Sequence, residues 1–262
     1  MNSRSSAPRA TFQEQVLDTL GREICSGQIR PGQLLPPEPD LCERFGFSRI
    51  VIREAIKSLA AKGLLEVTRR VGTLVLDQTR WNLFDPDIIA WRGETAALDP
   101  TLARDLMEVR RIIEPAAVRL AALRASDEDR RNLRAAYMAM ARAVAGKGDY
   151  VKADLAFHTI ILSACGNQFV RQMQDAMSAL LRVSFDVITT KPGGPAHSLP
   201  LHEAVCLAIE QGDGEAAERA AQILIDGAEE DLRELLPVRS GNARQAAVSM
   251  SAHDARRGVI HS

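Results

Sequence analysis

The chain has 262 residues, 46% of them hydrophobic and only 4% aromatic, which excludes a disordered protein and favours packed helices over a β-sandwich. Residues 1–80 carry 12 Lys and Arg against 9 Asp and Glu, whereas residues 81–236 carry 17 against 24, so the net charge of −1 hides an asymmetry. Because an acidic region repels DNA phosphates, any nucleic-acid binding belongs to the N-terminal part.

The N-terminal part begins with a polar stretch and two short helices. Residues 1–10 are rich in Ser and Arg and are predicted to be disordered. A first helix with a narrow apolar stripe follows, and Gly27 ends it. Three prolines delay the next helix until about Glu38, and Gly46 stops it after one short run.

A third helix follows after a short turn and has two faces of different character. Ser48 can accept a backbone N–H as its N-cap, and Gly63 supplies the C-terminal stop. Apolar residues fall on one arc, whereas Arg49, Arg53 and Lys57 recur at i, i+4 and i+8 on another. One face therefore packs and the other is cationic.

Two strand-like runs, LLEVT and TLVL, come next and flank a basic turn with Arg69 and Arg70. Together with the three helices they predict a winged helix-turn-helix over residues 11–80, in which the start of the third helix reaches base edges. The alternative is that the cationic face is only solvated. The basic charges at the start of the helix count against it, because the helix dipole disfavours Arg there unless an anion is present.

The rest of the chain is predicted to be a linker, a helical bundle and a tail. Residues 81–95 are rich in turn formers and hold both tryptophans, which suits an ordered linker. Residues 96–236 show only helical patterns, and residues 237–262 lose periodicity, as in a disordered tail. After a long helix that begins near Thr101, further helices are expected near residues 128–144, 150–163, 169–188, 201–210 and 215–236.

A candidate site lies in the apolar helix KADLAFHTIIL. Asp154 and His158 are four residues apart and share one face, although the helix is apolar nearly all round. His202 points inward from another helix, on a stripe with apolar residues. Burying these groups is costly unless they pair or bind something, and Asp, His and His are good ligands for Zn²⁺ or a similar divalent metal. The alternative is a satisfied hydrogen bond in the core.

The N-terminal residues resemble a known family. PG, LP, L-x-x-x-F-G-x-SR-x-x-x-REA-x-x-x-L-x-x-x-GL and R-x-G-T are similar to the GntR family of bacterial transcription regulators over most of residues 11–80. By that resemblance Ser48 caps the recognition helix. Arg49 and Arg53 are then expected to contact bases and phosphates, and the wing tip is expected to consist of Arg70, Gly72 and Thr73. Pro37 and Pro39 replace the usual Ser and Arg of the second helix, which removes one expected DNA contact.

Residues 96–236 resemble the helical effector domain (FCD) of the FadR branch of this family, through EVRRIIEPAA, the Asp154-x-x-x-His158 pair, GN and His202 before AIEQGD. Many members bind a metal through one Asp and three His; here the third His falls at Leu224, so three ligands remain. The matching Arg110 is expected to meet an organic acid, and its alternative is a surface pair with Glu114. Within the branch, WNLFDPDIIAW and ADLAFH are most similar to repressors of galactonate and related sugar-acid catabolism.

These observations predict a dimeric repressor that reads an inverted repeat in DNA and is released by a small organic acid, an aldonate above all. One alternative is a metal-dependent enzyme with an accessory DNA-binding domain, although the sequence has no hydrolase, P-loop or dinucleotide motif. Another is an architectural DNA binder without an effector. No apolar run reaches the roughly 18 residues of a membrane span, no signal peptide opens the chain and no C-x-x-C pair occurs, so a cytoplasmic protein is expected.

Overall fold

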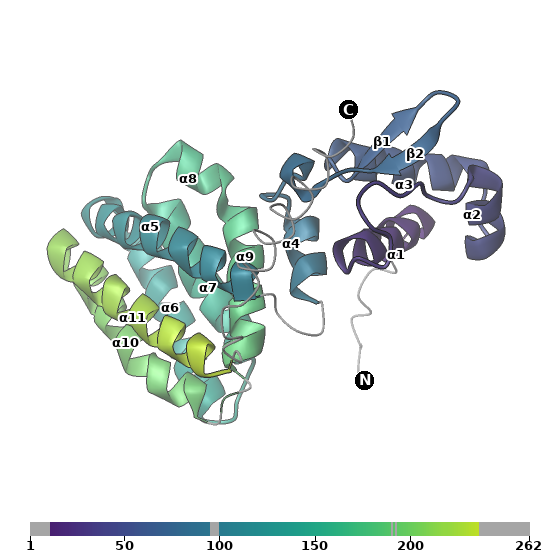
Figure 1. Ribbon diagram of the computed structural model, residues 1–262. Helices are drawn as coiled ribbons and strands as arrows, with labels where there is room; N and C mark the ends of the chain where they lie inside the picture. The colour runs from purple at the N-terminus through teal and green to yellow at the C-terminus, as the bar shows by residue number, and fades with distance from the viewer. Residues whose placement is uncertain (1–10, 95–99, 190, 192, 236–262) are drawn as a thin grey trace, which may run out of the picture.

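The computed structural model describes residues 11–94, 100–189, 191 and 193–235. Figure 1 shows two lobes with one helix, α4, between them. The terminal segments predicted to be disordered, 1–10 and 237–262, lie outside the described residues. None of the described helices is long and apolar enough to cross a membrane.

The N-terminal lobe contains α1 (Phe12–Cys25), α2 (Glu38–Phe45), α3 (Arg49–Ala61), β1 (Leu65–Thr68), β2 (Gly72–Val75) and a short 3-10 turn, η1 (Gln78–Arg80). A reciprocal capping box starts α1, in which the Thr11 hydroxyl accepts the Glu14 N–H and the Glu14 carboxylate accepts the Thr11 N–H. Gly63 follows α3 with φ of 79°, and a Cβ there would lie 2.3 Å from the Arg80 carbonyl oxygen. Only glycine fits this turn.

The two strands form an antiparallel ribbon, with Leu65 opposite Val75 and Thr68 opposite Gly72. A bridge from Leu34 to Leu74 attaches the segment before α2 to this ribbon. The predicted strand-turn-strand wing is therefore present. It projects from the side of α3, as Figure 1 shows.

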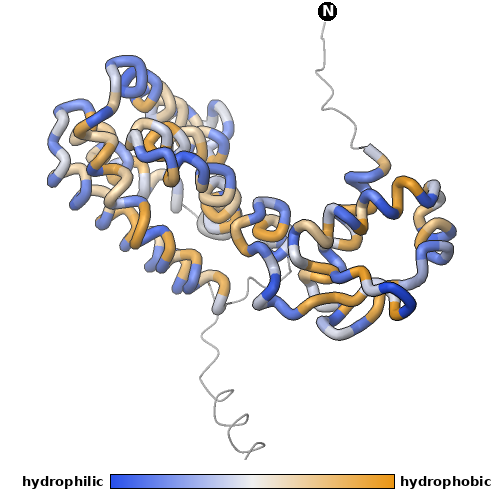
Figure 2. The backbone as a smooth tube through the Cα atoms, turned by 90° about the horizontal axis from the view of Figure 1, so that it is seen from above, coloured by the Kyte–Doolittle hydropathy of each residue, from blue (hydrophilic) through white to orange (hydrophobic). Residues whose placement is uncertain are grey.

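The helical lobe contains α5 (Pro100–Arg124), α6 (Asp127–Val144), α7 (Tyr150–Ala164), α8 (Gln168–Gln172), α9 (Gln174–Ile188), α10 (Gly194–Gln211) and α11 (Gly214–Leu235). Figure 2 shows hydrophobic and hydrophilic residues alternating along the helices, as expected when each helix buries one face. The predicted all-helical architecture is confirmed for the described residues of this lobe.

Two predicted helix boundaries in this lobe are wrong. The single helix expected over 169–188 is divided at Met173 into α8 and α9, and α9 then packs against α4 and α7. The helix expected from residue 201 begins at Gly194 instead, with Pro195 in its first turn and Pro200 inside it. Proline costs nothing in the first turn, where its N–H would be unpaired anyway, and packing of α10 on α11 and α6 compensates for Pro200.

Each lobe has its own hydrophobic core, and α4 (Pro86–Gly93) contributes to both. Ile88 and Trp91 belong to the N-terminal core, whereas Ile89 belongs to the core of the helical lobe. Because consecutive helical residues point about 100° apart, one short helix can supply both cores. The segment predicted to be a linker therefore contains a helix that packs on either side.

Glycines bring α4 close to its neighbours in both lobes. The ring of Trp91 packs on Gly21 of α1, where a Cβ would lie 2.5 Å from the ring, and its indole Nε1 donates to Asp18 at 3.2 Å. Toward the helical lobe, a Cβ on Gly93 would lie 2.4 Å from a methyl of Val183 on α9. A side chain at either glycine would push α4 away from its partner helix.

Candidate functional site

The exposed face of α3 carries the cationic side chains that were predicted to meet DNA. Arg49, Arg53 and Lys57 are all exposed, while Ile52, Ala55, Ile56 and Leu59 on the other side are buried. Arg53 is already paired, because its Nε lies 2.8 Å from a carboxylate oxygen of Glu38 on α2. An exposed pair of this kind contributes little stability, so a DNA phosphate can replace Glu38 as the partner of Arg53.

Ser48 stands at the N-cap position of α3, with extended backbone at φ −68° and ψ 157°. Its side chain makes no capping hydrogen bond, so the prediction that its hydroxyl accepts a backbone N–H is wrong. The N-cap position itself was predicted correctly, because Gly46 and the turn set the start of the helix. The Ser48 hydroxyl, however, can rotate away from the N–H groups of the first turn. The N–H groups of that turn are left without this acceptor, which suits a phosphate oxygen.

The wing tip consists of the exposed residues 69–71 between β1 and β2. Arg70 has φ of 70°, in the left-handed region that non-glycine residues rarely adopt. Gly72 and Thr73, which were predicted to share the tip with Arg70, instead open β2. Thr73 is half-buried and its carbonyl accepts the N–H of Leu35 at 2.8 Å, so it belongs to the sheet and not to the exposed tip.

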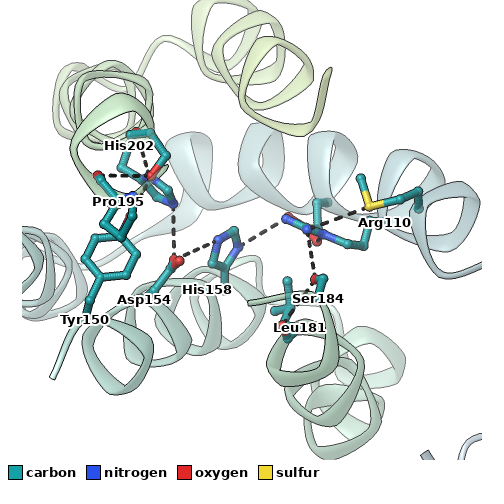
Figure 3. A network of polar contacts seen from close by, with 11 residues as sticks. Arg110, Tyr150, Asp154, His158, Leu181, Ser184, Pro195 and His202 are labelled. Carbon is teal, nitrogen blue, oxygen red and sulfur yellow. Dashed lines mark hydrogen bonds and ion pairs between the residues drawn. The ribbon is translucent and has the colours of Figure 1, made fainter. Parts of the chain in front are cut away.

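In the helical lobe, the three predicted metal ligands come together. Asp154 and His158 lie on α7, His202 lies on α10, and one ligand atom from each falls within 4.8 Å of the others. The Nε2 atoms of His158 and His202 lie 3.3 Å and 3.1 Å from Oδ1 of Asp154. All three side chains are buried, and Figure 3 shows them pointing toward one another from two helices.

The orientation of these atoms fits a metal better than a core hydrogen bond. Oδ1 of Asp154 and Nε2 of both histidines are buried, yet none has a hydrogen-bond partner of good geometry. Buried polar atoms of this kind are rare in proteins, and here three of them converge. Asp with two His is a ligand set that Zn²⁺ and similar divalent ions accept.

Each histidine also has an oxygen acceptor behind it. Nδ1 of His202 lies 2.9 Å from the Ser198 carbonyl, and Nδ1 of His158 lies 3.2 Å from Oε2 of Glu114. A proton on Nδ1 donates to these oxygens and leaves Nε2 with its lone pair facing Asp154. Metal-binding histidines are commonly oriented in this way.

The charges in this centre are strongly coupled. Burial by itself lowers the pKa of His158, but the carboxylates of Glu114 and Asp154 outweigh it and raise the pKa to about 9. Burial by itself raises the pKa of Asp154, but the two histidines hold it well below its usual range. A proton on Nε2 of His158 and a metal ion therefore compete for the same lone pair.

Arg110 on α5 is buried with 1% exposure, which excludes the alternative of a surface arginine. Its Nε donates to Oε1 of Glu114 at 2.7 Å, and one terminal nitrogen donates to the Ser184 hydroxyl on α9 at 3.3 Å. Burial by itself raises the pKa of Glu114, but Arg110 and His158 lower it to about 2. Glu114 therefore joins the arginine to the histidine centre, and Figure 3 shows Arg110 and His202 on opposite sides of His158.

A cavity adjoins Arg110 and two members of the buried cluster, Asp154 and His202. Leu224, the position of the third family histidine, is also in its wall, with 5% exposure. Asp231 in the wall is paired with Lys191 at 2.6 Å. The lining comprises Arg110, Tyr150, Asp154, Phe185, Thr189, Gly194, Pro195, His197, Ser198, Leu201, His202, Leu224, Gly227, Ala228 and Asp231.

Sequence reasoning missed several polar residues of this centre. Glu114 had a visible signal, since it is four residues from Arg110 on one helix, but it was weighed only as a surface partner. Ser184, Tyr150 and Asp231 gave no signal, because their roles depend on which helices pack together. Tyr150 and Ser198, whose hydroxyl oxygens lie 2.7 Å apart, belong to different helices.

Comparisons with known proteins match both lobes. Residues 12–75 match the model of bacterial regulatory proteins of the gntR family, and residues 105–227 match the FCD domain. These ranges fall within the predicted segments 11–80 and 96–236. Together they cover most of the described chain.

Two curated relatives from Escherichia coli (strain K12) are similar over nearly their whole length. The galactonate operon transcriptional repressor is 36% identical over 85% of this chain and 97% of its own. The uncharacterised HTH-type transcriptional regulator YieP is 30% identical over 86% of this chain and 97% of its own. A solved structure of Lar, described as controlling the expression of the Listeria monocytogenes agr system, has a TM-score of 0.62 at 20% identity, covers 87% of this chain and 100% of its own, and supports the fold.

Proposed function

Because the chain belongs to the gntR family of bacterial regulatory proteins and carries an FCD domain, we propose that it represses genes of sugar-acid catabolism and that an aldonate such as galactonate releases it from its operator. The family and the curated relatives are DNA-binding transcription regulators, not enzymes. The similarity to the galactonate operon repressor supports the choice of ligand class.

The observation that carries the ligand assignment is the cavity with Arg110 in one wall and the Asp154–His202 pair in another. An aldonate has a carboxylate next to a hydroxyl, followed by further hydroxyls. Arg110 has five N–H donors and uses one on Glu114, one on Ser184 and one on the Met107 sulfur, so two remain for a carboxylate. Asp231 can accept hydrogen bonds from hydroxyls farther along the ligand.

We also propose that Asp154, His158 and His202 hold a divalent metal, Zn²⁺ being one candidate. The three unsatisfied atoms support this assignment. A bound metal would supply a Lewis acid that attracts the carboxylate and the adjacent hydroxyl of the effector. Because Leu224 cannot act as a ligand, effector oxygens have more room at the metal than in relatives with a histidine there.

The size of the cavity suggests how effector binding is transmitted. The cavity has a volume of about 30 Å³, room for about two waters. An aldonate is larger, so we infer that the walls move apart when it binds. Phe185 in the wall lies on α9, two residues after Val183, which packs on Gly93 of α4. Movement of α9 would therefore shift α4, which also contributes to the core beneath α3.

The active species is proposed to be a cytoplasmic homodimer. Residues 11–80 bind DNA, residues 81–95 connect, and residues 96–236 bind the effector and dimerise. Two copies related by a two-fold axis place two α3 helices on an inverted repeat. Footprinting of one asymmetric site would contradict this arrangement.

Ligand binding is tested by thermal shift and calorimetry on the full chain with galactonate, and with galactitol as the control that keeps a six-carbon polyol chain without a carboxylate. A ligand at 100 times its Kd adds about 2.7 kcal/mol to the free energy of unfolding, so a clear shift is expected for galactonate alone. Galactonate should also release the protein from DNA in a gel-shift assay. An equal response to galactitol would exclude the Arg110–carboxylate contact.

Metal binding is tested by elemental analysis of protein purified without chelator. We expect about one divalent ion per chain and its loss in His158→Ala. His197 is an exposed histidine, but it lines the cavity and is therefore unsuitable as a control position. Thr159→Ala, next to His158 on α7 but half-buried and bonded to Ser178, is the matched control and should keep the ion.

A further inference from the structure

One residue at the start of the recognition helix is not explained by the packing of the fold. Ile50 is the second residue of α3, and 74% of it is exposed. Ile52, two residues farther along α3, is fully buried in the core. Burying an isoleucine stabilises a protein, so the fold forgoes that stabilisation at this position.

The surroundings of Ile50 are those of a DNA-reading surface. A rotation of about 100° per residue puts Ile50 about 60° around the helix axis from Arg53 and about 20° from Lys57. Arg49, directly before it, is exposed as well. An apolar side chain therefore lies at the edge of the cationic face of α3, in the first turn, where helix-turn-helix proteins contact base edges.

Among the base edges in the major groove, the apolar group available to an isoleucine is the 5-methyl group of thymine. Arginine and lysine select guanine or bind phosphates, so they cannot report this methyl group. We propose that Ile50 is a specificity residue that contacts one thymine methyl in each operator half-site. The inference rests on the docking of α3 in the major groove.

The test uses a duplex that the protein selects from a random-sequence pool. Each dT is replaced in turn by dU, which pairs identically but lacks the methyl group, and affinity is measured by anisotropy at one fixed salt concentration. One dT per half-site should be sensitive, with about a four-fold loss for the removal of one buried methyl. Ile50→Ser should bind the dT duplex more weakly and be indifferent to dU at that position.

Val67→Ser is the matched control, because Val67 is an exposed aliphatic residue on the wing strand β1. This variant should keep the full dU penalty of the wild type. Tolerance of dU at every position, or an unchanged dU penalty in Ile50→Ser, would overturn the proposal. If the pool yields no preferred duplex, the docking of α3 in the major groove is overturned together with the Ile50 proposal. Failure of the Ile50 proposal alone can therefore be told apart from failure of the docking.

Discussion

The buried pair of Arg110 and Glu114 allows the effector contact to be separated from fold stability. Arg110→Met removes the charge but retains a long unbranched side chain, and we expect it to abolish galactonate response. The same change leaves Glu114 at 5% exposure without its closest cation, 2.7 Å away. Removing one partner of a buried ion pair costs about 3–5 kcal/mol, because the other charge stays buried and uncompensated.

For a chain of this size, a change of that magnitude corresponds to a lowering of Tm by roughly 6–20 °C. Loss of response in the single variant could therefore reflect unfolding. The double variant Arg110→Met with Glu114→Gln removes both charges, and the Gln oxygen can still accept from Nδ1 of His158. We expect its Tm to recover most of the loss, since replacing both partners of a buried pair is often neutral.

The double variant should bind operator DNA as the wild type does and should not be released by galactonate. An effector shifts an equilibrium only by its difference in affinity between two states. In the proposed mechanism the Arg110 contact supplies that difference. Gel shift with and without galactonate, together with calorimetry, measures both quantities. Equal galactonate affinity in the two proteins would remove Arg110 from the effector site, and an unchanged Tm in Arg110→Met would refute the ion-pair argument.

Three further predictions concern the other elements. Arg49→Ala should cost about 1–3 kcal/mol in operator affinity without changing galactonate affinity, and an unchanged gel shift would contradict the docking of α3. Leu224→His should tighten metal binding by adding a ligand in the cavity wall, whereas Ile223→His, on the exposed face of α11, should leave the metal Kd unchanged. Gly93→Ala should raise the galactonate concentration that releases half of the protein from DNA, because the new Cβ would lie 2.4 Å from Val183 and displace α4. Adding Val183→Ala should restore the wild-type concentration. Identical release curves for the Gly93→Ala protein and the wild type would separate α4 from the response.

Local sequence determined most of the N-terminal lobe. The helix boundaries there follow from single residues whose backbone preferences act without tertiary help, such as Gly46 with φ of 70° and Gly63 with φ of 79°. The two faces of α3 follow from its periodicity alone. The same holds for Asp154 and His158, whose four-residue spacing puts them on one face of any α-helix.

Tertiary structure decided what those residues meet. His202 reaches Asp154 because α10 packs near α7, and Arg110 bonds Ser184 because α5 lies near α9; neither juxtaposition has a trace in sequence spacing. The early start of α10 at Gly194 has the same origin, since the backbone cost of Pro200 is offset by contacts with distant helices. Burial likewise excluded the alternative of a surface position for Arg110. The environment of a side chain depends on every element packed around it, whereas periodicity describes only the helix that carries it.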